Sequence, residues 1–367
     1  MHIADMLVRR PVPTAGLFLS LTRRCPLTCA HCSTNSMMSS EEHDEEIFRR
    51  FVDTFTEADH PEMVWLTGGE PLLRPQLVLD LVNACHRVGS KVAIITGLYY
   101  ARADGHIPKA LIPALRAVDH VIVSQDIYHE VQIPRAHAFA TVQTLLDFGQ
   151  DVSFQVVGQN NSDPYLADVT SDIRTTFADR VPALVANLAP MGRGQSLLAA
   201  ARMRPVTSSP NDAHRDAAPC TMAAWPVVGY DGAISACCQQ RVIDGPIPDH
   251  LNLGNALTTG WPEVSRQLRQ RSTLRAIRII GPEKLVQDAG LPLSDCGFCT
   301  TCIHDGSRPE VSAQAEAMVA SSGFAAVETE VVRLQVDAGP EYFARRSGVP
   351  SYASMMTLGL PVAAVTG

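Results

Sequence analysis

The chain has 367 residues, a formal net charge of −8 and ten cysteines. This length is enough for one large domain and one smaller one. The acidic charge, with scattered basic residues, excludes nucleic acid and anionic membrane surfaces as expected partners. We find no signal peptide and no apolar run long enough to cross a membrane, so we expect a cytoplasmic protein. In such a protein, clustered cysteines indicate metal binding rather than disulfides.

Short β-type runs alternate with helical patterns between Leu17 and Met191, which predicts a parallel sheet built from βα units. The predicted strands are 16–21, 63–66, 91–96, 120–124, 152–157 and 183–189. Apolar residues recur with helical spacing over 47–55 and 77–88, and Gly89 is expected to end the second helix. Cys85 lies on the apolar face of that helix, so we predict that it is a core residue.

Three cysteines, Cys25, Cys29 and Cys32, fall within eight residues directly after the first predicted strand. Three thiols can hold an iron–sulfur cubane and leave one iron open to an outside molecule. The alternative is a structural zinc site with His31 as the fourth ligand. After the second predicted strand comes Gly68-Gly69-Glu70, where glycines permit close approach of the backbone and a carboxylate can bind an ammonium group.

The spacing C-x3-C-x2-C followed by Gly-Gly-Glu resembles the radical S-adenosylmethionine (radical SAM) superfamily. The resemblance implies a partial (β/α)6 barrel with a [4Fe-4S] cluster on the three cysteines. The open iron would bind SAM, and Glu70 with Gly68 and Gly69 would contact the methionyl amine. One electron, supplied by an external reductant of the flavodoxin or ferredoxin type, would cleave SAM to a 5′-deoxyadenosyl radical that abstracts hydrogen from a substrate.

Ligands of parallel α/β folds bind beyond the carboxyl ends of the strands. The resemblance implies that Ser124 and Asp126 bind the ribose of SAM and that the stretch around Met191 packs against adenine. We also count Gln155 and His31 among the residues that contact SAM. The stretch 96–100 after the third strand departs from the family pattern, so the resemblance does not predict whether this stretch contacts SAM.

His129 and Glu130 follow the same strand exit and have two interpretations. They are catalytic groups that face the substrate, with a neutral histidine taking a proton from an oxidised substrate radical, or they are solvated residues that begin the next helix. The sequence does not decide between these roles.

Residues 204–219 are rich in Pro, Ser, Asn and Asp, which predicts a linker after a barrel domain of residues 1–203. A small α+β domain is expected over 220–306. It begins with a β-hairpin whose Asp231-Gly232 turn suits type I′. Residues 307–367 form a C-terminal extension with a helix near 311–318 and a β-like run at 331–336. We expect its apolar end, 352–365, to pack against the barrel or cover the substrate mouth.

The cysteines of the second domain resemble the SPASM/twitch extension of radical SAM enzymes, which binds auxiliary [4Fe-4S] clusters. The pattern departs from a full SPASM domain because no cysteine follows Cys302. We therefore predict one auxiliary cluster held by Cys220, Cys237 and two of Cys296, Cys299 and Cys302. A zinc ribbon built from the same cysteines is the alternative, and spacing alone does not separate the two metals.

Cys238 directly follows Cys237, a predicted cluster ligand. Adjacent residues of a strand point to opposite faces, so Cys238 would face either the core, where free cysteines usually lie, or the cavity between the domains. In the cavity it would be a catalytic candidate, because its thiol would give a hydrogen atom to a substrate radical, as an epimerase needs.

Three functions fit these patterns. The first is oxidative modification of a ribosomally made peptide, by cross-linking or dehydrogenation. Only a short segment precedes the first strand, so we expect the peptide to bind at the barrel mouth or through a separate leader-binding protein. The second is a dehydrogenase or epimerase that acts on a small molecule such as an amino sugar. The third is a non-catalytic zinc or iron–sulfur scaffold, which leaves Gly68–Glu70, Ser124 and Asp126 without a role.

Overall fold

The computed structural model describes residues 1–200, 216–293 and 297–361, and its strands form one sheet in the order β6-β5-β4-β3-β2-β1-β7-β8-β9. The first six are parallel neighbours, as predicted. They are β1 Gly16–Ser20, β2 Met63–Thr67, β3 Lys91–Thr96, β4 His120–Ser124, β5 Val152–Gly158 and β6 Ala183–Asn187. The sixth strand therefore ends two residues before the predicted boundary.

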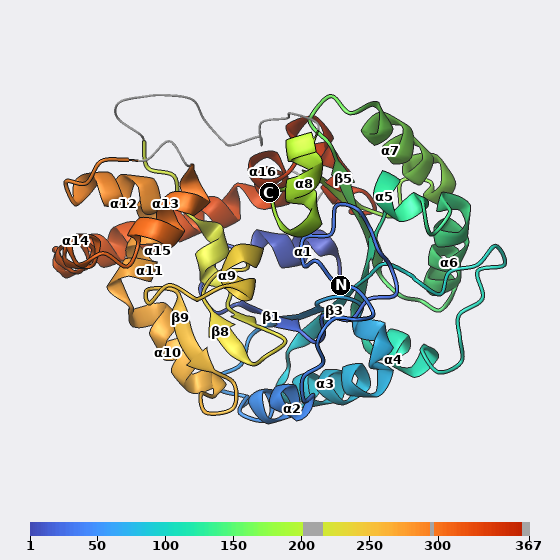
Figure 1. Ribbon diagram of the computed structural model, residues 1–367, viewed down its shortest axis with the longest axis horizontal. Helices are drawn as coiled ribbons and strands as arrows, with labels where there is room; N and C mark the ends of the chain where they lie inside the picture. Colours follow the sequence, from blue (N-terminus) through green and yellow to red (C-terminus); the bar gives the residue numbers. More distant parts are fainter. Residues whose placement is uncertain (201–215, 294–296, 362–367) are drawn as a thin grey trace.

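Helices between these strands cover the outer side of the curved sheet (Figure 1). They are α2 Glu46–Val52, α3 Pro75–Val88, α4 Ile112–Ala117, α5 Ile127–Glu130, α6 Arg135–Asp147 and α7 Pro164–Phe177, with α1 Ile3–Val8 before β1, the short 3-10 helix η1 Pro71–Leu73 after β2, and α8 Gly192–Ala200 after β6. Helix α3 buries Leu77, Leu81 and Cys85 against the sheet, which confirms Cys85 as core. It ends at Gly89, whose φ of 96° is left-handed.

The predicted hairpin is β7 Val227–Val228 and β8 Ala233–Ser235, and β9 Asn252–Asn255 pairs with β8. Strand β7 also pairs with β1 in parallel, so the hairpin continues the barrel sheet. Its turn is not type I′, because Asp231 is outside the left-handed region and only Gly232 has a positive φ, of 84°. The division between a barrel domain and a cluster domain stays a prediction, and residues 201–215 of the predicted linker lie outside the described residues.

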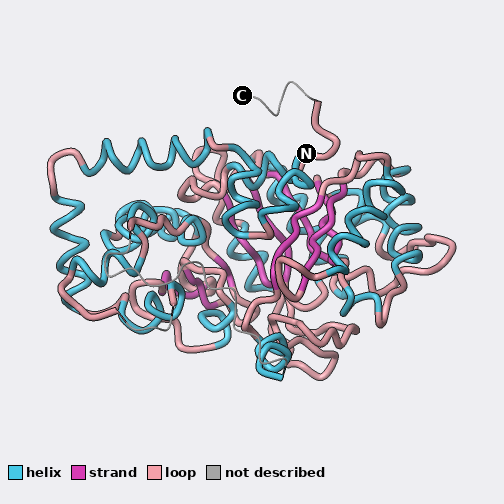
Figure 2. The backbone as a smooth tube through the Cα atoms, turned by 90° about the horizontal axis from the view of Figure 1, so that it is seen from above, coloured by secondary structure: helices cyan, strands magenta, loops and turns pink. Residues whose placement is uncertain are grey.

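Helices form a second lobe beside the barrel (Figure 2). They are η2 Thr221–Ala224, α9 Gln240–Asp244, α10 Trp261–Gln270, α11 Ser272–Ile280, α12 Pro282–Asp288, α13 Phe298–Asp305, α14 Pro309–Ala320 and α15 Phe324–Asp337. Helix α14 contains the helix predicted near 311–318, but the β-like run at 331–336 is helical, so that prediction was wrong. Within this helix, Arg333 forms ion pairs with Glu330 and Asp337, which lie three and four residues away. Pairs at this spacing favour a helix over a strand.

The chain then returns to the barrel through α16 Gly339–Ser347 and the 3-10 segment η3 Pro350–Thr357. The Val349 amide donates to the Val185 carbonyl at 2.9 Å, so this segment covers the free edge of β6. Ala353, Met355 and Met356 are buried, which confirms that the apolar end packs on the barrel as far as it is described. None of the described helices is long and apolar enough to span a membrane.

Candidate functional site

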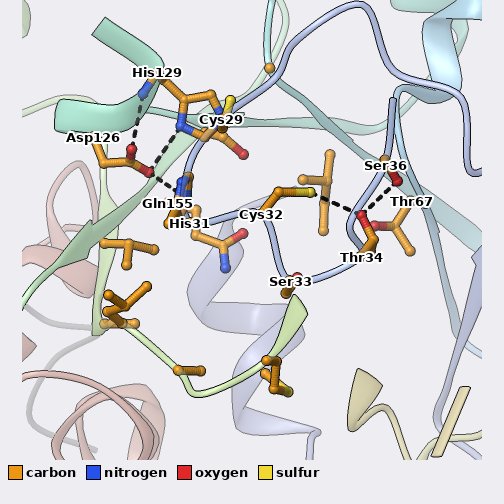
Figure 3. A pocket seen from close by; sticks show the side chains of 18 of the residues that line it. Cys29, His31, Cys32, Ser33, Thr34, Ser36, Thr67, Asp126, His129 and Gln155 are labelled. Atoms are coloured by element: carbon orange, nitrogen blue, oxygen red, sulfur yellow. Dashed lines mark hydrogen bonds and ion pairs between the residues drawn. The ribbon is translucent and has the colours of Figure 1, made fainter. Parts of the chain in front are cut away.

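The three cysteines after β1 line a cavity of about 520 Å³ at the carboxyl ends of the parallel strands. Figure 3 shows two of them, Cys29 and Cys32. We call this cavity the first cavity. The other predicted residues that line it are Gly68, Gly69, Glu70, Ser124, Asp126, His129, His31, Gln155 and Met191. The fold thus brings together side chains from the exits of β1, β2, β4, β5 and β6, as expected for a parallel α/β sheet.

The two glycines after β2 let that loop pack against the loop that carries the cysteines. A Cβ atom on Gly69 would lie 2.3 Å from the Arg24 carbonyl oxygen, and one on Gly68 would lie 2.5 Å from the Thr22 carbonyl oxygen. The Gly69 amide donates to Thr22 at 2.6 Å and the Glu70 amide donates to Arg24 at 2.9 Å. These glycines therefore position the backbone just before Cys25, a role beyond the approach to a ligand.

Glu70 is fully buried, and its carboxylate accepts hydrogen bonds from the amides of Leu72 and Gly97 and from Thr96 Oγ1, at 3.0 to 3.1 Å. All of these donors are neutral. Burial raises the pKa of Glu70 to about 7, and the hydrogen bonds oppose the shift only in part. A cationic ligand group at this carboxylate would restore its charged form, so the site fits the amine of SAM.

Asp126 is the N-cap of α5, and its buried carboxylate joins two histidines. Its Oδ2 atom lies 2.9 Å from His129 Nδ1 and 3.1 Å from His31 Nε2, while Oδ1 accepts the amides of Tyr128 and His129 (Figure 3). These contacts satisfy the carboxylate within the protein and hold its pKa well below the usual range, although burial acts in the opposite direction. Ribose hydroxyls would have to share or replace these partners.

The surroundings of His129 do not favour the neutral base that one interpretation of the sequence required. Burial lowers its pKa, but the Asp126 carboxylate outweighs that effect and raises the pKa of His129 to about 10. The imidazole is therefore protonated near neutral pH. Its neighbour Glu130 is not a lining residue of the first cavity. The Glu130 carboxylate instead accepts from Tyr165 at 2.6 Å, Arg135 at 2.7 Å and Gln125 at 2.9 Å.

Ser124 ends β4, and its register partner Gln155 lies in the middle of β5; both residues border the cavity. His31 stacks on Tyr128 with ring centroids 4.7 Å apart, and its Nδ1 is buried without a hydrogen-bond partner. An unpartnered ring nitrogen and these two polar side chains fit a nucleoside ligand that carries hydrogen-bonding groups of its own.

A second cavity of about 920 Å³ lies beside the first, and five cysteines line it. These are Cys220, Cys237, Cys238, Cys299 and Cys302. Cys296 lies outside the described residues. Strand β8 ends at Ser235, so the alternation of a strand does not apply to Cys237 and Cys238, and both border the cavity; Cys238 does not lie in the core.

Burial raises the pKa of the Cys299 thiol to about 11 and raises those of Cys220, Cys237 and Cys302, and neighbouring thiols add to each shift. A tetrahedral zinc ion with bonds of about 2.3 Å would hold its sulfurs roughly 3.8 Å apart. Among the described residues, only His31, Asp126 and His129 place three potential ligand atoms within 4.8 Å of one another. None of the described thiols belongs to such a group of three.

Several residues that line or support the cavities have no motif and were missed by sequence reasoning. Met222 and Ser347, together with Met191, border both cavities, and Phe343 of α16 borders the first. His250 Nε2 lies 3.5 Å from Cys302 Sγ. Arg193 donates to the carbonyls of Cys29 and Ser36 at 2.9 Å, which fastens the cysteine loop to the start of α8. Its place in the 190–194 stretch was the only sequence signal.

The comparison with known families agrees with this geometry. Residues 19–168 match the profile of the radical SAM superfamily, and this part of the chain is a radical SAM domain. The radical SAM family implies a SAM molecule and a [4Fe-4S] cluster, and Cys25, Cys29 and Cys32 with the carboxylate of Glu70 fit them.

Among characterised proteins, the chain is 36% identical over 124 residues to "PqqA peptide cyclase" of Streptomyces rochei, which covers 33% of this chain and 32% of that protein. It is 36% identical over 121 residues to "PqqA peptide cyclase" of Ruegeria pomeroyi, covering 31% and 29%. The matches thus span about a third of the relatives' length. Among solved structures, Streptococcus suis SuiB bound to precursor peptide SuiA gives a TM-score of 0.48 at 12% identity, over 71% of this chain and 67% of that one.

Proposed function

We propose that this protein cleaves SAM reductively and uses the 5′-deoxyadenosyl radical to oxidise a ribosomally made peptide, by cross-linking or dehydrogenation. The observation that carries the proposal is the pairing of the two cavities. One holds three cysteines and the buried carboxylate of Glu70, whose hydrogen-bond donors are all neutral, and the other holds five cysteines, with Met191, Met222 and Ser347 bordering both.

In this proposal Cys25, Cys29 and Cys32 hold the SAM-binding cluster, and Glu70 binds the methionyl ammonium. His31, Ser124, Gln155 and Met191 surround the adenosyl group. When bound, the cluster supplies the electron that breaks the sulfonium, and an external one-electron donor such as a flavodoxin or ferredoxin restores it.

In the second cavity, Cys220, Cys237 and two of Cys296, Cys299 and Cys302 would hold an auxiliary [4Fe-4S] cluster, which would accept one electron. The substrate would lose one hydrogen atom to the radical and one proton to solvent. SAM ends as methionine and 5′-deoxyadenosine, and the product has two hydrogens fewer than the substrate. Asp126 raises the pKa of His129 and holds its ring by a hydrogen bond. We therefore assign His129 to positioning the Asp126 carboxylate rather than to accepting the proton that the substrate loses.

The peptide substrate is supported by the peptide cyclases that match part of this chain. A separate leader-binding protein is the corresponding expected partner. Oxidation, rather than epimerisation, is supported by the position of Cys238. This thiol borders the second cavity and is not among the residues that line the first, where a thiol that quenches a substrate radical would have to reach.

The test is anaerobic reconstitution followed by reduction with dithionite and measurement of 5′-deoxyadenosine by chromatography. The wild type should form it and a Cys29→Ala variant should not. With a candidate peptide in deuterated water, the product should be two hydrogens lighter. A product of unchanged composition that carries one solvent deuterium at an inverted carbon would instead establish an epimerase.

A further inference from the structure

Arg10 is a buried arginine between the barrel and the hairpin that the proposed chemistry does not yet use. It follows α1 and is 2% exposed. Its guanidinium carbon lies 5.2 Å from the ring centroid of Phe18 on β1 and 4.8 Å from that of Trp225, next to β7. This stack fixes the side chain at the junction where the hairpin joins the barrel sheet.

The charge of Arg10 has no carboxylate partner in the described part of the chain. Its Nη2 atom lies 3.3 Å from Met222 Sδ and 3.4 Å from Cys238 Sγ, and its Nη1 atom is buried without a hydrogen bond. Arg278 is buried to a similar degree, at 3% exposure, but it lies 3.7 Å from Glu328. Burying a cation is unfavourable unless an anion compensates its charge. Stacking on aromatic rings offsets only part of that cost.

The groups that face Arg10 from the second cavity are the thioether of Met222 and cysteine thiols. Burial lowers the pKa of Arg10, and the neighbouring cysteines Cys238, Cys220 and Cys237 oppose this effect. A thiol becomes an anionic thiolate when it binds a metal. The proposed function therefore provides one anionic group near the Arg10 guanidinium, namely a cluster with several cysteine ligands.

We propose that Arg10 is a positioning residue that supplies the compensating positive charge for the auxiliary cluster and raises its reduction potential. The inference rests on the proposed function, because it requires a cluster in the second cavity. Net charge and hydrogen bonds to sulfur are among the determinants of the potential of such clusters. A higher potential makes the cluster a better acceptor for the electron that the substrate radical must lose.

The experiment uses the full chain with Cys25, Cys29 and Cys32 replaced by alanine, so that all remaining iron reports on the second cavity. Arg10→Met keeps an apolar side chain between Phe18 and Trp225 but removes the charge, and Arg10→Lys keeps the charge. The control is Arg275→Met, since Arg275 also stacks on an aromatic ring, Phe324, at 5.0 Å, and pairs with Glu328.

The readouts are iron per chain and the midpoint potential from a titration followed by electron paramagnetic resonance. We expect a potential shifted to more negative values in Arg10→Met, with Arg10→Lys and Arg275→Met close to the parent. A potential unchanged in Arg10→Met at full iron content, or an equal shift in Arg275→Met, overturns the inference. If the parent itself binds no iron, the auxiliary cluster of the proposed function is wrong, which is a separate result.

Melting temperatures with and without iron separate this role from simple packing. Removing an unpaired buried charge should leave the metal-free protein as stable as the parent or more stable, and should lower the stability of the iron-loaded protein. A loss of similar size in both states, or an Arg10→Met chain that does not fold without metal, shows that Arg10 only supports the packing.

Discussion

The two cavities border each other, yet they are built in opposite ways. The thiols of the first come from one eight-residue loop, and the exits of neighbouring strands hold that loop through Thr22, Arg24 and Arg193. The thiols of the second come from segments far apart in the chain, Cys220 before η2, Cys237 and Cys238 after β8, and Cys299 and Cys302 on α13.

The barrel alone therefore brings the thiols of the first site together. The thiols of the second site come together only when the hairpin and the helical lobe pack beside the barrel. The charges differ in the same way. The first cavity contains a buried carboxylate that fits a cationic ligand, Glu70, whereas the second has a buried guanidinium that fits an anionic one, Arg10. A substrate between them would lie between a radical source and an electron acceptor.

The largest expected effect comes from removing either set of cysteines. The Cys25, Cys29 and Cys32 triple alanine variant should form no 5′-deoxyadenosine but keep about four irons per chain in the second cavity. Cys220→Ala with Cys237→Ala should still cleave SAM but yield no oxidised product. Elemental analysis and chromatography of the same samples check both results. Zinc in place of iron in the triple variant contradicts the prediction.

Gly69→Ala tests whether the packing of the loop after β2 against the cysteine loop supports the first site but not the second. The added Cβ would lie 2.3 Å from the Arg24 carbonyl oxygen, so the loops must separate. We expect a loss of about 3 kcal/mol in the free energy of unfolding, together with loss of iron from the first site only.

The control for this substitution is Gly149→Ala, where the new Cβ meets nothing within 4 Å but φ is +81°. Strain alone should cost about 1 kcal/mol there. Urea denaturation and iron content measure both variants. Equal losses of stability and iron in the two variants are incompatible with the proposed loop packing.

His120 tests the opposite end of the sheet, which we assign to stability rather than chemistry. Burial lowers its pKa to about 4, and its ring bonds the Met1 carbonyl at 2.7 Å and Ser153 Oγ at 2.8 Å. Because the folded pKa lies below the unfolded value of about 6.5, the contribution is present above that value and is lost as the pH falls toward 4.

Between pH 7 and pH 5 this linkage removes about 2 kcal/mol of stability from the wild type. His120→Gln lacks the titrating group, so its stability should fall less over the same range, as denaturation at several pH values would reveal. Parallel pH profiles for the two proteins would mean that His120 is not buried in its neutral form. SAM cleavage at pH 7 should be unaffected in the variant.

The smallest effect on SAM cleavage is expected for Phe343→Ala at the boundary between the cavities. The side chain borders the first cavity from α16 but makes none of the contacts that hold the cysteine loop. We expect 5′-deoxyadenosine formation close to that of the wild type, but about tenfold less oxidised product per SAM cleaved, because the substrate is less well oriented. Leu334→Ala on the exposed side of α15 is the control. An unchanged product ratio argues against a substrate next to α16.

The sequence by itself determined the parallel sheet, the loop that carries Cys25, Cys29 and Cys32, and the Gly68–Glu70 turn. These features depend on local spacing and on the rule that the carboxyl ends of parallel strands share one edge. Periodicity also predicted α3 with Cys85 in its core face. It was misleading at 331–336, where three valines with β propensity lie within helix α15.

Only the tertiary structure decided which groups share a cavity and what charge they carry. The protonation of His129 depends on Asp126, and the separation of Glu130 from the first cavity depends on Arg135 and Tyr165. Likewise, Arg10 stands 228 positions from Cys238 in the sequence and contacts its sulfur only because β7 pairs with β1. Burial and long-range contacts set these properties, and neither can be read from the spacing of residues along the chain.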